Sequence, residues 1–195
     1  MSDFLQQMAN ASRERAAAIT RHFSDDALDV PRPALKLDRF DVIAEIKDRS
    51  PAEGQLAQAG GDRLQRARRY ADGGAAAVSV LTEPTQFGGS LEHLRDVAAL
   101  LAGLGVPVMR KDFLVDPLQL LEARAAGAAG ALPIAAMLDD AGLATMLDCA
   151  AEHDLFILLE AFDEADLERI RRLLEQARHA ERAARGELLV GVNTP

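Results

Sequence analysis

Several residue types are scarce in this sequence, and each shortage argues against a class of protein. The 195 residues include one cysteine and no tryptophan, and aromatic residues make up 4% of the chain. A single cysteine cannot form an internal disulfide, so a disulfide-stabilised fold is excluded. Basic residues are outnumbered, with 22 Lys and Arg against 31 Asp and Glu and a formal net charge of −9. That acidic balance argues against nucleic acid or an anionic membrane surface as a partner.

Long apolar runs are also lacking. No stretch reaches the roughly 18 to 20 apolar residues that a membrane-spanning helix needs. The first residues, MSDFLQQMANASRERAAA, have neither the basic region nor the apolar region of a secretory signal. Hydrophobic residues nevertheless make up 49% of the chain, a proportion that is ordinary for a soluble globular core. We therefore expect one cytoplasmic domain over residues 1–195.

Short apolar runs alternate with helical patterns along the chain. Asp116 can cap a helix that begins at Pro117, and Gly127 is placed where a glycine would end it. A helix over about residues 3–22 opens an N-terminal extension and connection, residues 1–37. This alternation predicts a parallel β-sheet covered by helices. The apolar runs are residues 41–46, 77–81, 106–109, 130–134, 155–159 and 188–192.

Two charged residues stand in the first predicted strand, within VIAEIKDRSPAEG at residues 42–54. Because side chains at i and i+2 share one face of a strand, Ile43, Glu45 and Lys47 point the same way. In an open, doubly wound sheet this column would lie under a helix layer, where an unpaired charge is costly. In a barrel of the triosephosphate-isomerase (TIM) type, the column rises from a packed interior to an open mouth. We therefore favour the α/β barrel.

Other predicted strands also finish on polar residues. Lys111 follows the third strand, Glu160 the fifth and Asn193 the sixth. In a barrel these side chains would meet Glu45 and Lys47 at the same mouth. Burial lowers the pKa of a lysine and raises that of a carboxyl group, so such a set suits general acid–base catalysis. The alternative is that the lysines and glutamates form ion pairs that only stabilise the strand ends.

No metal or nucleotide motif competes with this interpretation. Gly88 and Gly89 fit neither a dinucleotide-binding nor a phosphate-loop pattern. Cys149 lies in the helical pattern LATMLDCAAEH, where we expect a structural residue and not a nucleophile. Charges of both signs alternate in the Arg/Glu-rich segment 168–187, so we expect a solvated helix face and not an RNA-binding patch. The histidines lack the spacing of metal ligands, namely His22, His93, His153 and His179.

Five segments together resemble the indole-3-glycerol-phosphate synthase family of tryptophan biosynthesis. The stretch VIAEIKDRSPAEG is similar to the family's first strand and the loop after it. The stretch VSVLTEPTQFGGSLEHL is similar to the family's second strand and the loop after it. The stretch VPVMRKDFLVDPLQLLEARAAGA is similar to its third strand and the following helix. The stretch LLEAFDEADLERI is similar to the family's fifth strand, and LLVGVN is similar to its sixth strand. The resemblance implies a TIM-type (β/α)8 barrel, and the N-terminal helix fits the extension that these enzymes carry.

The resemblance also implies a reaction without a cofactor or a metal. The substrate, 1-(2-carboxyphenylamino)-1-deoxyribulose 5-phosphate, would be cyclised and decarboxylated to indole-3-glycerol phosphate. Lys111 would be the acid that protonates the ribulose carbonyl, and Lys47 would hold anionic groups and share in proton transfer. Glu45 and Glu160 would serve the dehydration as a base or as charge stabilisers. The remaining implied substrate contacts are Ser50, Phe87, Phe113 and Asn193.

The chain departs from the family pattern in several places. The family continues into a seventh and an eighth strand, whose loops build the phosphate site, whereas this sequence ends at GVNTP. We therefore expect a barrel that lacks strands seven and eight. Three interpretations remain open: a fragment of a complete enzyme, an inactive natural truncation, or a protein whose missing strands come from a partner or from a swapped protomer, with self-association through the open edge. Within the barrel, Pro133 stands in a predicted central strand, and Phe162 stands where histidine is common.

Two alternative functions remain open at this point. A truncated, catalytically inactive barrel could bind a partner through its open edge. A phosphoribosylanthranilate isomerase is a second enzyme of the same pathway, but the KDF and EIKDRSP segments argue against it.

Overall fold

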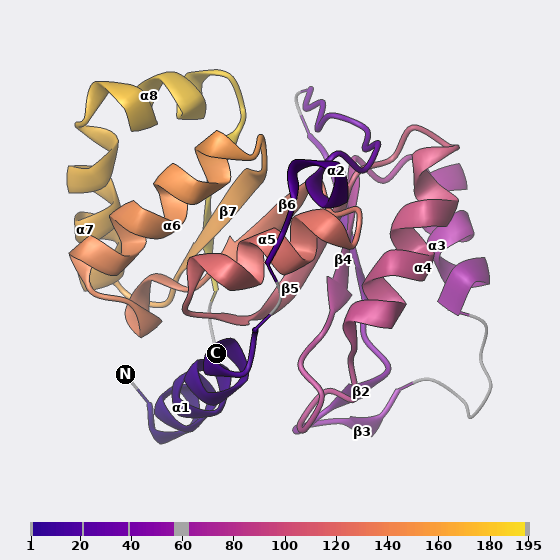
Figure 1. Ribbon diagram of the computed structural model, residues 1–195, viewed down its shortest axis with the longest axis horizontal. Helices are drawn as coiled ribbons and strands as arrows, with labels where there is room; N and C mark the ends of the chain where they lie inside the picture. The colour runs from indigo at the N-terminus through magenta and orange to yellow at the C-terminus, as the bar shows by residue number, and fades with distance from the viewer. Residues whose placement is uncertain (1, 21, 39, 57–62, 194–195) are drawn as a thin grey trace.

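The fold is built around a curled parallel sheet. The computed structural model describes residues 2–20, 22–38, 40–56 and 63–193. Within them, six strands form one parallel sheet in the order β1-β4-β5-β6-β7-β8, so that each new strand joins the same edge (Figure 1). The strands are β1 (Ile43–Ile46), β4 (Ala77–Leu81), β5 (Val108–Leu114), β6 (Gly130–Pro133), β7 (Phe156–Ala161) and β8 (Leu188–Val192).

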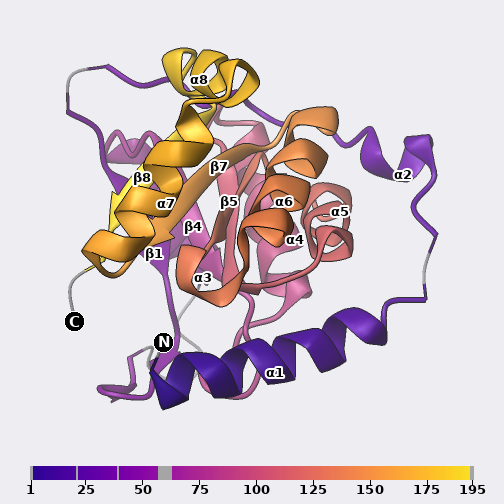
Figure 2. The same ribbon diagram turned by 90° about the vertical axis from the view of Figure 1, so that its left-hand side faces the viewer.

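Helices cover the convex face of this sheet and one of its ends. Helix α1 (Asp3–Ala17) crosses the carboxyl ends of the strands, and α2 (Asp25–Leu28) lies near the opposite end (Figure 2). A small hairpin of β2 (Arg49–Ser50) and β3 (Gly54–Gln55) comes after β1. Among the described helices, none is both long and apolar enough to cross a membrane. The helices on the convex face are α3 (Arg63–Asp72), α4 (Leu91–Ala102), α5 (Pro117–Ala125), α6 (Asp140–Glu152), α7 (Glu164–Leu174) and α8 (Ala177–Ala184), and a 3-10 turn, η1 (Ala135–Met137), comes after β6.

Buried apolar side chains lie on both faces of the sheet. Two clusters lie between its convex face and the covering helices. A third lies on the concave face, where Met109, Leu132 and Phe156 belong to one apolar cluster with Leu5 and Met8 of α1. A sheet with helices outside and an apolar concave interior has the arrangement of a barrel wall and not of a doubly wound sheet.

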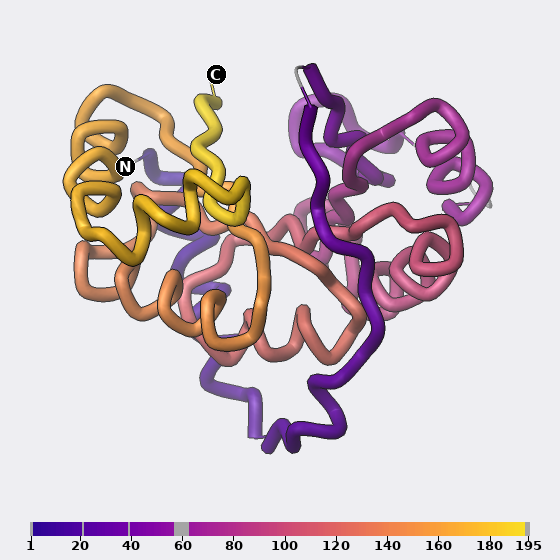
Figure 3. Tube along the Cα trace, turned by 90° about the horizontal axis from the view of Figure 1, so that it is seen from above, coloured from indigo at the N-terminus to yellow at the C-terminus, as the bar shows by residue number. Residues whose placement is uncertain are grey.

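The predicted TIM-type architecture is therefore confirmed in the form of a partial barrel. Strands equivalent to a seventh and an eighth do not occur in the part of the chain that the structure describes. Seen from above, the trace curls so that β8 and the segment leading into β1 stand at its two ends (Figure 3).

The predicted end signals of helix α5 are realised. The Asp116 carboxylate accepts a hydrogen bond from the Leu118 amide at 2.8 Å. The Gln119 side chain in return accepts one from the Asp116 amide at 3.1 Å, which completes a capping box. Pro117 takes the first helical position, and Gly127 adopts a φ of 89° just beyond the helix, a conformation that favours glycine.

Some elements differ in length from the predictions. Strand β5 runs to Leu114 instead of ending at residue 109, so Lys111 lies within the strand and not after it. The first helix ends at Ala17 instead of near residue 22. Pro133 is the last residue of β6 and lies opposite Leu114, where the register of the ladder shifts. An irregular ladder tolerates a proline because the missing N–H is not needed there.

The prediction of a solvated helix face over residues 168–187 is confirmed for most of the charged side chains, which are exposed, and fails for His179 and Arg182, which are buried. The segment forms the end of α7 and the whole of α8, and some of its polar side chains are buried. Arg182 is 6% exposed and donates hydrogen bonds to the carbonyls of Leu147 and Leu155 at 3.0 and 2.7 Å. Alternating charge signs in the sequence do not reveal such buried bonds to the main chain.

Cys149 has the structural role that its helical setting predicts. It lies half-buried on α6. Burial, and then the negative charges of Glu152 and Asp116, raise the pKa of its thiol to about 11. Because the thiolate is the nucleophilic form, a thiol with this pKa is unreactive near neutral pH.

His179 on α8 is a buried histidine without a hydrogen bond at Nε2. Its side chain is 1% exposed, and Nε2 has no partner within the described structure. Burial, and then the positive charge of Arg178, lower the pKa of His179, while Asp148 opposes this effect. Burial also lowers the pKa of His93, so both histidines favour the neutral form. In the unfolded chain a histidine takes up a proton near pH 6.5.

We predict that the free energy of unfolding falls as the pH drops below about 6.5, because the unfolded state then binds more protons than the folded state. Above that pH the contribution of His179 is fully present. A His179→Leu variant should lose part of this dependence in urea unfolding followed by circular dichroism between about pH 7.5 and pH 5.5. His22→Leu, at an exposed position, is the matched control. An unaltered pH dependence in His179→Leu would contradict the assignment.

Candidate active site

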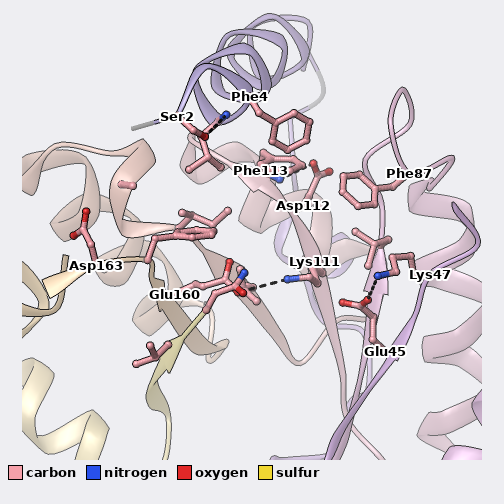
Figure 4. Close-up of a pocket in the computed structure, with 18 residues that line it drawn as sticks. Ser2, Phe4, Glu45, Lys47, Phe87, Lys111, Asp112, Phe113, Glu160 and Asp163 are labelled. Atoms are coloured by element: carbon pink, nitrogen blue, oxygen red, sulfur yellow. Dashed lines mark hydrogen bonds and ion pairs between the residues drawn. The ribbon is translucent and has the colours of Figure 1, made fainter. Parts of the chain in front are cut away.

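A cavity of about 750 Å³ opens at the carboxyl ends of the strands, beneath α1 (Figure 4). All but one of the side chains proposed from the sequence line it. Ser50 is the exception: it is buried in β2, and its hydroxyl accepts a hydrogen bond from the Ala52 amide at 3.3 Å. The proposed residues that line the cavity are Glu45, Lys47, Phe87, Lys111, Phe113, Glu160 and Asn193.

The strand ladder explains why these side chains meet. Lys111 pairs in the ladder with Leu81 on one side and Leu132 on the other, and all three line the cavity. Glu160 is bridged to Ile134, which also lines it. Side chains at the same level of neighbouring parallel strands share one face, so the concave face carries them together.

Two oppositely charged pairs face the cavity. Lys47 Nζ lies 3.3 Å from Glu45 Oε1, and Lys111 Nζ lies 3.7 Å from Glu160 Oε1 (Figure 4). The side chains of Lys47 and Lys111 are 27% and 26% exposed. Both ion pairs that the sequence suggested as alternatives to a site are therefore present, and both lie inside the cavity.

Lysine is rare elsewhere in the chain. Only three lysines occur among its 22 basic residues, and two of them, Lys47 and Lys111, line this cavity. The third, Lys36, is exposed in the connection before β1. An arginine keeps its proton in proteins, whereas a lysine can give its proton up. The basic residue type that can transfer protons is thus concentrated at the cavity.

An aromatic wall stands above the charged pairs. The ring of Phe113 lies 6.0 Å from that of Phe87 and 5.9 Å from that of Phe4, measured between centroids. The Phe4 contact is edge-on, a favourable arrangement for aromatic pairs. Phe4 was not predicted, because it comes from α1 and no local pattern links it to Phe113. Phe162, which stands where the family commonly has histidine, also lines the cavity.

A buried polar network supports this wall. The Asp112 carboxylate accepts hydrogen bonds from Arg15 at 2.7 Å, from Thr82 at 2.7 Å and from Arg110 at 3.0 Å. Arg110 is only 4% exposed. Glu83, which is fully buried, accepts a hydrogen bond from the Phe87 amide at 3.1 Å. These contacts hold α1 and the loop of Phe87 in place around the cavity.

The fold and the cavity define an α/β barrel-type protein with paired lysine and glutamate side chains at the carboxyl ends of its strands. Among the described residues, no three His, Cys, Asp or Glu side chains form a group able to hold a metal ion. The chain belongs to the indole-3-glycerol phosphate synthase family, whose profile matches residues 4–177.

Individual relatives agree with this assignment. A protein of Nocardioides sp. named indole-3-glycerol phosphate synthase is 46% identical over 163 residues, which cover 84% of this chain and 56% of the relative. Its namesake in Hyphomonas neptunium is 42% identical over 136 residues, covering 70% of this chain and 50% of the relative. The chain thus spans about half the length of the curated relatives it matches. The comparisons give no support to a catalytically inactive binding domain.

Likeness to solved structures is weaker. A dihydropteroate synthase from Xanthomonas albilineans aligns with 20% identity and a TM-score of 0.49 over 84% of this chain and 59% of that chain. A likeness at this level is too weak to indicate a function.

We predict that Asp112→Ala lowers the free energy of unfolding by about 3 kcal/mol or more, because it leaves Arg110 buried without its main counter-charge. Urea unfolding measures the loss. Asp140→Ala is the matched control, since its pair with Arg169 lies at the surface and Asp140 is 66% exposed. The control should lose less than about 1 kcal/mol. Equal losses in the two variants would contradict the structural importance of the buried network.

Proposed function

We propose that the chain is an indole-3-glycerol-phosphate synthase, a carboxy-lyase of tryptophan biosynthesis. Its substrate is the phosphorylated small molecule 1-(2-carboxyphenylamino)-1-deoxyribulose 5-phosphate, and its product is indole-3-glycerol phosphate. The observation that carries this proposal is the placement of two lysine–glutamate pairs in one cavity beside a wall of phenylalanine rings. Family membership supports the same reaction.

Lys111 acts as the acid of the ring-closing step. The aromatic carbon that bears the carboxylate bonds to the ribulose carbonyl carbon, and the carbonyl oxygen takes a proton from the Lys111 ammonium. The carboxylate then leaves as carbon dioxide, and its bonding electrons restore the aromatic ring. Glu160 exchanges protons with Lys111, a role that the distance of 3.7 Å between Glu160 Oε1 and Lys111 Nζ supports.

Lys47 and Glu45 complete the reaction. Lys47 holds an anionic group of the substrate and shares in proton transfer. Water leaves from the ring-closed intermediate while a proton is removed, and Glu45 or Glu160 is the base or the charge stabiliser of that dehydration. Asn193, which lines the cavity, contacts the sugar portion.

Aromatic packing orients the anthranilate ring of the substrate. Phe87 and Phe113 line the cavity with their rings tilted at 42° to one another, and they can pack against a planar ligand. Ser50 has an indirect part, because its hydroxyl is engaged with the Ala52 amide and shapes the turn between β2 and β3.

Residues 1–195 act as one barrel domain, with residues 1–37 as its extension and connection. The protein works in the cytoplasm, without nucleic acid or membrane partners. Copies of the chain self-associate through the outer edges of the sheet, where Val42, just before β1, and Val192, at the end of β8, are 52% and 65% exposed. An unpaired strand edge is able to pair with another chain.

We predict that Lys111→Ala lowers the rate of indole-3-glycerol phosphate formation at least about 100-fold, the usual scale of general acid catalysis. The indole product can be followed by its fluorescence because the chain has no tryptophan. Lys36→Ala removes the same side chain outside the cavity and should leave the rate unchanged. Failure of the unsubstituted chain to form product would contradict the proposed activity, and an active Lys111→Ala variant would contradict the role of Lys111.

We also predict that the chain sediments as a dimer or larger at micromolar concentration in analytical ultracentrifugation. Val192→Lys should shift it towards the monomer, because a lysine on an edge strand opposes strand pairing. Leu104→Lys, at a position 39% exposed after α4, is the control and should sediment unchanged. A monomer at all concentrations would overturn the self-association proposal.

A further inference from the structure

The residue directly after Lys47 is held by two arginines outside the cavity. Asp48 accepts a hydrogen bond from Arg63 Nη2 at 2.5 Å through one carboxylate oxygen and a short one from Arg66 Nη2 through the other. Both arginines come from α3 on the convex face. We call Asp48, Arg63 and Arg66 the Asp48 clamp. Asp48 does not line the active-site cavity, so the proposed chemistry does not use it.

The Asp48 clamp is a partly buried arrangement of charges. The side chains of Asp48, Arg63 and Arg66 are 20%, 23% and 27% exposed. Burial by itself would raise the pKa of the Asp48 carboxyl, but the hydrogen bonds and charges of the two arginines outweigh it and lower that pKa. The carboxylate therefore stays ionised near neutral pH. Asp48 is the carboxylate with which both arginines form ion pairs, and their Nε atoms are buried without a hydrogen-bond partner in the described structure.

The clamp also reaches the main chain of Lys47. Arg66 Nη1 donates to the Lys47 carbonyl at 3.4 Å, a long hydrogen bond. The Asp48 carbonyl in turn accepts from the Leu56 amide at 2.9 Å, which ties the clamp to the chain just after the β2–β3 hairpin. The main chain on the carboxyl side of Lys47 is thus held from α3 and from the end of the hairpin.

Lys47 depends on this support because the sheet does not provide it. The ladder between β1 and β4 ends at the pair Ile46 and Val80, one residue before Lys47. Lys111, by contrast, lies inside β5 and pairs with strands on both sides. Two lysines that face the same cavity are therefore positioned by different means. The sheet positions Lys111, whereas the contacts of Asp48 position Lys47.

We propose that Arg63 and Arg66, acting through Asp48, are positioning residues that direct the Lys47 ammonium toward Glu45 and into the cavity. The effect of this placement on catalysis rests on the proposed function, whereas the placement itself does not. If the clamp is released, the Lys47 side chain leaves its position 3.3 Å from Glu45 and moves into solvent. Its amine then becomes more accessible to reagents than the amine of Lys111.

The test is competitive labelling of the folded chain with acetic anhydride, read residue by residue by mass spectrometry. With three lysines in the chain, each amine can be resolved, and Lys36 serves as an internal standard. In Asp48→Asn we expect the labelling rate of Lys47 to rise at least about threefold relative to Lys111, because the reagent reaches the released amine on its flexible side chain more easily. Asp48→Glu, which keeps the carboxylate, should restore most of the original ratio.

Two further variants keep the result interpretable. Asp72→Asn makes the same chemical change at an exposed position on α3 and should leave all three rates unchanged. Arg66→Gln keeps the pair of Arg63 with Asp48 but removes the contact with the Lys47 carbonyl, so it tests the proposal even if Asp48→Asn does not fold. It should also raise the labelling of Lys47 selectively.

An unchanged ratio of Lys47 to Lys111 labelling in the folded variants would overturn the proposal, because a purely structural clamp would destabilise the chain without a selective effect on Lys47. A uniform rise at all three lysines would overturn it too, since that result reports general loosening. The labelling does not require turnover. A chain that fails to form product but shows the selective rise would contradict the proposed function and leave the positioning role intact.

Discussion

The Asp112 carboxylate is the contact on which the arrangement of the cavity depends. It is fully buried and accepts hydrogen bonds from α1, from β5 and from Thr82 just after β4, through Arg15, Arg110 and the Thr82 hydroxyl. Lys111 and Phe113, its neighbours along β5, both line the cavity. One buried carboxylate thereby fixes the strand that carries the proposed acid and the helix that covers it. The concave apolar cluster completes the attachment of α1, since Leu5 and Met8 bury their side chains there.

The two lysine side chains that face the cavity are positioned in different ways. Lys111 stands within a ladder bonded on both sides, so its direction is set by the regular strand geometry. Lys47 comes after the last ladder pair of β1 and is supported from the convex face by Asp48 and two arginines. Sites built on regular elements are positioned more accurately than sites on loops. Of the two lysines that face the cavity, Lys47 is thus the one whose position is more sensitive to substitutions outside the cavity.

Much of the fold and most of the site were predictable because their signals are local. The i, i+2 rule placed Glu45 above Ile43, and the caps at Asp116 and Gly127 marked α5. The bond from Arg15 to Asp112 joins residues 97 positions apart, and the rings of Phe4 and Phe113 come from similarly distant parts of the chain, so no local pattern predicts either contact. The sequence also predicts that β5 ends at residue 109, whereas the strand runs to Leu114. The charges within VMRKDFL are typical of a strand end, although buried partners satisfy them here.

The cavity, as we interpret it, binds an aromatic anion between its phenylalanine wall and its lysines. Equilibrium titration with anthranilate tests this interpretation most directly, because the emission of anthranilate is not obscured in a chain without tryptophan. We expect a saturable change in emission with one anthranilate bound per chain. Emission that is independent of protein concentration would contradict the interpretation.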